Sequence, residues 1–170
     1  IQNSITIGTR LSGNSIGHYS FTNGERITAS GISSHAEGQC TKALGDYSHA
    51  EGGFTEASGN TSHAEGGFTK ALGDYSHAEG NETIASGSTS HAEGDNTIAS
   101  GNTSHAEGDN TIASSENQHV QGSYNIEDVG GKYAHIGGNG TDNNNRSNAH
   151  TLDWNRNAWY ACDVQSNNMP

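Results

Sequence analysis

The chain has little of what stabilises an ordinary globular domain. Hydrophobic residues make up 29% of its 170 residues and aromatic residues 6%, whereas nearly half of a typical domain is apolar. A chain of this composition cannot bury a large apolar core. It is either disordered or a repeat protein that buries small residues in thin layers. Its two cysteines, Cys40 and Cys162, are too few for a disulfide framework and are expected to be free thiols.

Cations and long apolar runs are also scarce. Seven Lys and Arg residues stand against 19 Asp and Glu residues, which gives a formal net charge of −12. This excess of negative charge argues against binding to nucleic acid or to an anionic membrane surface. No apolar run approaches the length that is needed to span a bilayer, so we expect no membrane insertion.

What the chain has in abundance is a 14-residue repeat. Histidines recur at this spacing, and six of them lie in the pentapeptide Ser-His-Ala-Glu-Gly, from Ser34–Gly38 to Ser104–Gly108. A seventh copy, Gln118–Gly122, is degenerate, and an earlier copy has Phe21 in the place of histidine. Strict repetition at a fixed period is the signature of a solenoid.

Fourteen residues suit one coil of two short strands joined by two tight turns. Gly38 and Gly45, and their equivalents, are expected at the two corners, where glycine takes positive φ without strain. Side chains alternate between the two faces of a strand, and only small residues fit inside so narrow a coil. The inward positions are therefore expected to be those of Ser34, Ala36, Gly38, Thr41 and Ala43.

The fold class that follows is all-β, a parallel β-roll or β-solenoid with a short β cap at the C-terminus. Two-residue insertions flank the array, because the spacing rises to 16 between Gly8 and Gly24 and again between His119 and His135. We therefore divide the chain into an irregular first coil or junction (1–20), the β-roll (21–122) and a C-terminal cap or junction (123–170).

The His and Glu of each pentapeptide point outward and yet do not vary over six coils. Other outward positions do vary: Cys40 becomes Phe54 and then Asn96, and Lys42 becomes Ile84. Something constant must face the invariant side chains, and the simplest candidate is the same strand of another copy. We therefore predict a homotrimer with an interface ladder of His35, Glu37, His49, Glu51, His63, Glu65, His77, Glu79, His91, Glu93, His105, Glu107 and His119.

Two other interpretations of these residues are catalysis and metal binding. Ser34 and His35 are neighbours on a strand, so their side chains leave opposite faces and cannot act as nucleophile and base. We therefore expect no enzyme and no catalytic residues. Three imidazoles around a threefold axis could hold zinc or nickel, but a ladder of His paired with Glu is favoured. We expect no cofactor and no metal.

The pattern resembles the head repeat of trimeric autotransporter adhesins, whose motif is Ser-Val-Ala-Ile-Gly and which Ser4–Gly8 matches. That resemblance implies a left-handed roll in which the Val and Ile positions, here His35 and Glu37, face the trimer interior. The Ser-His-Ala-Glu-Gly version is similar to bacteriophage and prophage tail-fibre or minor structural proteins. So is the C-terminal sequence around Tyr133–Thr141 and Arg146–Ala161, although Arg156 and Cys162 replace expected glycines.

The resemblance implies a structural shaft or spacer of a trimeric phage tail fibre or similar surface fibre, which presents a receptor-binding tip. Its location would be the virion, or the extracellular space or cell surface. Two alternatives stay open. One is an adhesin head that binds a bacterial surface receptor or a glycan. The other is part of a self-cleaving fibre with a separate autoproteolytic domain.

Three aromatic residues close to the C-terminus flank the segment Asn155–Asn157. Trp154, Trp159 and Tyr160 surround what the sequence predicts to be a β-hairpin. Exposed aromatic side chains in a polar chain could contact a ligand such as a sugar, but an apolar plug that ends the rod is favoured.

Overall fold

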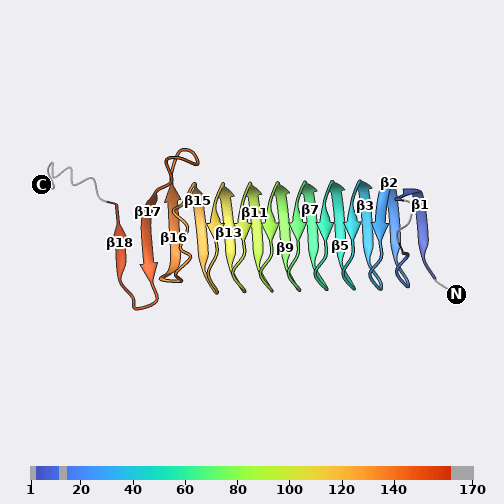
Figure 1. Ribbon diagram of the computed structural model, residues 1–170, viewed down its shortest axis with the longest axis horizontal. Coiled ribbons are helices and arrows are strands. Elements are labelled where there is room, and N and C mark those ends of the chain that lie inside the picture. Colours follow the sequence, from blue (N-terminus) through green and yellow to red (C-terminus); the bar gives the residue numbers. More distant parts are fainter. Residues whose placement is uncertain (1–2, 12–14, 162–170) are drawn as a thin grey trace, which may run out of the picture.

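A computed structural model describes residues 3–11 and 15–161, which form one elongated row of stacked strands (Figure 1). Two parallel sheets run along the row. The first, which we call the histidine sheet, comprises β1 (Ile5–Arg10), the start of β2 (Phe21–Ala29), β3 (His35–Gln39), β5 (His49–Gly53), β7 (His63–Gly67), β9 (His77–Asn81), β11 (His91–Asp95), β13 (His105–Asp109), β15 (His119–Ser123) and β16 (Tyr133–Asn139). The second, the narrow sheet, comprises the end of β2 with β4 (Lys42–Ala43), β6 (Glu56–Ala57), β8 (Lys70–Ala71), β10 (Ile84–Ala85), β12 (Ile98–Ala99) and β14 (Ile112–Ala113).

Each regular coil gives one strand to each sheet, and every strand pairs in parallel with its equivalent in the next coil. His35 is paired with His49, and Lys42 with Glu56, so the register equals the 14-residue repeat. This confirms the predicted all-β solenoid. The histidine sheet continues beyond the regular coils, because Ile5 pairs with Phe21 and His119 with His135 across the two-residue insertions. Within the described residues, no helix is long and apolar enough to cross a membrane.

The space between the two sheets is filled by small side chains. Ala36 of the histidine sheet and Ala43 of the narrow sheet are fully buried, as are their equivalents in every regular coil. Ser34 and Thr41 are buried beside them, and the Ser34 hydroxyl donates a 2.7 Å hydrogen bond to the carbonyl of Gly31. The inward placement of these four residues is therefore confirmed. Larger buried side chains occur towards the two ends, at Ile27, Val120 and Ile136.

Ala64→Leu is expected to destabilise the roll, because Ala64 has no exposed surface and a close-packed site resists added methylenes. Overpacking of this kind costs roughly 1–3 kcal/mol per chain. The matched control is Ser58→Leu, since Leu44 and Leu72 occupy the equivalent position in neighbouring coils and are 37% and 40% exposed. Thermal melting should show a lower midpoint for Ala64→Leu and little change for Ser58→Leu. Equal melting of the two variants would mean that the inward and outward faces are reversed.

The two glycines expected at the corners, Gly38 and Gly45, follow the sequence prediction only in part. Gly38 does have positive φ, at 105°, but it lies within β3 with its surface exposed and does not face inward. Gly45 lies at the bend between β4 and β5, as predicted, but it is buried and lacks the positive φ that we expected there. A Cβ on Gly45 would overlap the carbonyl of Gly59 in the next coil, so glycine is needed there for close stacking of the backbones. The left-handed corners are occupied by variable residues such as Cys40 and Tyr47, at φ of 57° and 59°.

The sheet reverses direction after β16. β17 (Asn148–Asp153) pairs antiparallel with β16, and β18 (Ala158–Tyr160) pairs antiparallel with β17, at the end of the row opposite β1 (Figure 1). The Asp153 carboxylate accepts hydrogen bonds from the backbone N–H groups of Asn155 and Asn157 and so holds the turn of this hairpin. Arg156 adopts positive φ, 70°, where the resemblance led us to expect glycine. Cys162 lies outside the described residues.

Candidate functional site

The outer face of the histidine sheet carries a continuous column of aromatic rings. From His35 to His119, the ring centroids of successive histidines are 4.5–4.8 Å apart and the ring planes lie within 8° of parallel. Phe21 extends the column at one end, with its ring 4.9 Å from that of His35. The parallel register places equivalent side chains directly above one another, so the repeat itself produces this column.

The column continues across the irregular end of the rod. The ring of His135 lies 5.1 Å from that of His119, that of His150 lies 5.0 Å from His135, and that of Tyr160 lies 5.9 Å from His150. His150 was not predicted to belong to this face. The sequence held no signal for it, because its position depends on the antiparallel pairing of Gly137 with His150.

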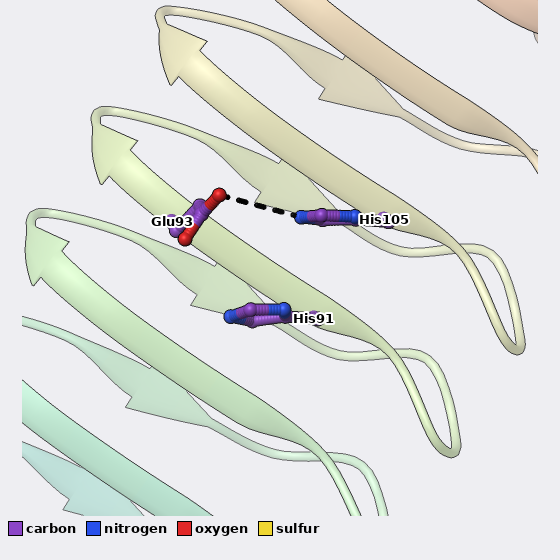
Figure 2. Close-up of side chains that lie close together, drawn as sticks. All are labelled: His91, Glu93 and His105. Atoms are coloured by element: carbon purple, nitrogen blue, oxygen red, sulfur yellow. Dashed lines mark ion pairs between the residues drawn. The ribbon is translucent and has the colours of Figure 1, made fainter.

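A second column, made of the glutamates, runs beside the histidines. Each Nε2 from His63 to His119 faces a carboxylate oxygen of the preceding coil, at 3.4–3.9 Å. Figure 2 shows one such pair, Glu93 and His105, with His91 stacked on the neighbouring strand. The paired side chains are each about one-third exposed, for example 34% for His105 and 35% for Glu93. The thirteen predicted ladder residues therefore lie on one face, and the trimer interface itself stays a prediction.

The histidine Nε2 atoms are buried without a hydrogen bond. Each Nε2 from His35 to His119 has almost no accessible surface and no hydrogen-bond partner within the described residues. The separations from the carboxylates exceed the 2.7–3.2 Å of a normal N–H···O hydrogen bond. Within one chain the histidine column is thus held by ring stacking, and the polar ladder is incomplete.

Burial and mutual repulsion disfavour protonation of the stacked imidazoles. The pKa values of His35, His49 and His63 are lowered, chiefly by burial and secondly by the charge of the neighbouring histidine, against the opposing effect of nearby glutamates. The pKa values of His105 and His135 are lowered for the same two reasons. These five imidazoles are therefore neutral at neutral pH.

Acidification is expected to destabilise the histidine column. A histidine with a folded pKa below its unfolded value of about 6.5 contributes stability that is complete above that pH and is lost as the pH falls towards the folded pKa. The melting temperature, measured with EDTA from about pH 7.5 to 5, should fall less in His63→Gln than in the parent. A fall as steep in the variant as in the parent would contradict the lowered pKa of His63.

A shallow groove runs along the same face beside the glutamates. Its floor is a column of exposed glycines and its wall is the row of glutamate side chains, in two stretches that meet at Glu79 and Gly80. The glycines from Gly38 to Gly122 have φ of 101–109°, which residues with a Cβ rarely adopt. This groove gives side chains of another chain room to approach the sheet.

The C-terminal aromatic residues do not form one cluster. Trp154, Trp159 and Tyr160 are 50%, 55% and 64% exposed, so within one chain they are not the favoured apolar plug. Trp154 Nε1 donates a 3.1 Å hydrogen bond to the carbonyl of Gly131. Trp159 lines a small pocket with Tyr133, whereas Tyr160 ends the ring column. Contact of these residues with a ligand stays a prediction.

The fold and this face define a class: the chain is a β-solenoid of 14-residue coils, of the kind that forms the head β-roll of trimeric autotransporter adhesins. The coils also match at the level of sequence. Two copies of the YadA head domain repeat match residues 78–104 and 92–114, which include all of β10 to β14. A search of curated proteins found no match.

Proposed function

We propose that the chain is a non-enzymatic structural shaft or spacer of a homotrimeric surface fibre that presents a receptor-binding tip. The observation that carries the proposal is the exposure of apolar residues on the histidine face. Ile5 and Ile7 are 61% and 55% exposed, and they pair with Phe21 and Asn23 in the positions of the pentapeptide His and Glu. Exposed apolar side chains at the positions of the pentapeptide His and Glu indicate that a partner covers this face.

The regular coils support the same conclusion. Their histidines and glutamates are only partly covered by their own chain, and the buried Nε2 atoms lack a hydrogen-bond partner within it. A second and third copy on this face would supply partners and would bury Ile5 and Ile7. YadA head repeats are parts of trimeric adhesins on the cell surface, which fits this arrangement. The pentapeptide repeat and the C-terminal sequence favour a phage tail fibre and thus a virion location.

The oligomeric state is the direct test of this proposal. Multi-angle light scattering of the purified chain should give a particle of three 17.7 kDa chains at micromolar concentration. The expected reason is that a single coil stack buries only small side chains and needs further apolar burial to be stable. A stable, folded monomer at that concentration would sink the proposal.

A second candidate function, an adhesin head, is favoured by one observation. Phe54 and Phe68 are 50% and 54% exposed, and their rings stack 4.9 Å apart at a corner between the two sheets. Both have φ near 60°, a strained conformation for a bulky residue. A glycan and extracellular-matrix binding screen should detect a ligand that is lost in Phe54→Asn with Phe68→Asn. Asn96 and Asn110 show that asparagine fits this corner.

The third candidate, membership of a self-cleaving fibre, concerns a separate domain. The hydroxyls of five pentapeptide serines, from Ser34 to Ser90, are buried and donate hydrogen bonds to backbone carbonyls on the opposite face from the histidines, which supports a non-enzymatic role for the roll. Mass spectrometry of the complete gene product should show one uncleaved chain if the fibre does not cleave itself. Two fragments would favour the self-cleaving fibre.

A further inference from the structure

Three neighbouring side chains of the glutamate and histidine columns are of the types that bind metal ions, and they form a set of their own. His91, Glu93 and His105 each offer one donor atom, and these three atoms lie within 4.8 Å of one another. They project from the adjacent strands β11 and β13 towards the same side of the sheet (Figure 2). Three further sets recur along the columns, but they overlap, because Glu51 and Glu65 each belong to two of them. The set at His91 shares no residue with the others.

The separations suit a shared cation better than a hydrogen bond. His105 Nε2 is 3.7 Å from Glu93 Oε1, which is too long for an N–H···O hydrogen bond. Two ligands that each lie about 2.1 Å from one ion are roughly 3.4–4 Å apart when the angle between them is about 110–145°. The Nε2 atoms of both histidines are buried and have no hydrogen-bond partner within the described chain. An ion would give each of them one.

Binding of one ion requires the two imidazoles to converge. Their ring centroids are 4.7 Å apart and the planes are 8° from parallel, so the in-plane lone pairs of the two rings run side by side, and each ring must rotate by some tens of degrees to point its lone pair at a shared ion. The torsion that tilts an imidazole has a broad energy well. A water molecule can complete the fourth position, because the face is about one-third exposed.

The donor types select the ion. Two imidazole nitrogens and one carboxylate oxygen suit zinc and related transition metals, whereas calcium and magnesium require oxygen ligands. We propose that His91, Glu93 and His105 form a binding site for a divalent first-row transition metal ion, with zinc the best-suited occupant. The site is built from one chain and goes beyond the structural role, so it does not depend on trimer formation.

The experiment uses the chain without a polyhistidine tag, stripped with EDTA and dialysed. Titration calorimetry with zinc chloride should show binding at micromolar concentration, and His91→Gln with His105→Gln should bind one zinc ion fewer per chain. Ile98→Gln, in the same coil but on the narrow sheet, is the control and should bind as many ions as the parent. With cobalt as the probe, the parent should show the visible absorption of a tetrahedral site, and the double variant should lose that part of it.

Unchanged zinc stoichiometry in a folded double variant, or no binding by the parent, overturns the proposal. If the double variant does not fold, Glu93→Gln replaces it, because this change keeps the shape of the side chain; unchanged cobalt absorption in Glu93→Gln then overturns the proposal. Light scattering on the metal-free protein separates this question from the fibre role. A trimer that binds no zinc refutes the site alone, and a monomer that binds zinc refutes the trimer alone.

Discussion

Gly59→Ala is expected to destabilise the rod strongly. Gly59 is buried, and a Cβ there would overlap the carbonyl carbon and oxygen of Gly73 and approach the Asp74 nitrogen to 2.9 Å. These are backbone atoms of the next coil, so no side chain can rotate away. The two coils must separate or the strands must shift. The expected loss is about 4–5 kcal/mol per chain, the class of effect that single substitutions rarely reach.

The matched control lies in the same coil. A Cβ on Gly53 would meet no atom within 4 Å, and Gly53 lacks positive φ, so Gly53→Ala should leave the melting temperature nearly unchanged. The chain also contains a natural replacement of one of these stacking glycines. Ser115 stands in the place of Gly101, where the following segment is longer by two residues, and its hydroxyl donates a 2.6 Å hydrogen bond to the carbonyl of Asp128. Similar melting of Gly59→Ala and Gly53→Ala would show that coil stacking does not require the glycine.

The second large effect is expected for His77 and Glu79. If His77 and Glu79 meet their equivalents from the other chains in a closed trimer interior, replacing either residue alone leaves the other members of the set buried without a charge or hydrogen bond. That loss costs roughly 3–5 kcal/mol. Replacing both with the apolar pair of the adhesin motif, His77→Val with Glu79→Ile, should restore much of the stability. Ile5 and Ile7 already occupy the equivalent positions of the first coil.

The unassembled chain predicts a different result for the same variants. In the single chain His77 faces Glu65 and Glu79 faces His91. The side chains of His77 and Glu79 are each about 34% exposed, and partly exposed pairs of this kind contribute less than about 1 kcal/mol each. The measurement is the melting temperature of the two single variants and of the double variant, all with EDTA so that bound metal does not contribute. Single variants that melt like the parent would place the His and Glu face outside any closed interface.

The period and the faces of the roll were predictable because small residues leave few options. A coil with Ser34, Ala36, Thr41 and Ala43 at fixed positions can be closed only with these four inside, since nothing larger fits. Strand alternation then places His35 and its equivalents outside. Local sequence and overall fold agree at every coil, which is the condition under which pattern alone identifies a structure.

The parts that escaped prediction depend on contacts between coils. Glycine at position 45 looks like a turn residue, but its necessity arises from the carbonyl of Gly59 above it. The left-handed corners fall on Cys40 and Tyr47, residue types that carry no turn signal. The place of His150 in the ring column follows from an antiparallel pairing in the C-terminal hairpin, which no repeat announces.

The constant register has a consequence for how such a rod evolves. Because His35 pairs with His49 and every later strand repeats that pairing, deletion or duplication of 14 residues restores the same neighbours at the junction. Each such event shortens or lengthens the rod by one strand spacing, about 4.8 Å. Slippage or recombination between the coding sequences of these repeats would therefore yield folded rods of graded length. The length of the rod can be selected without any change to its cross-section.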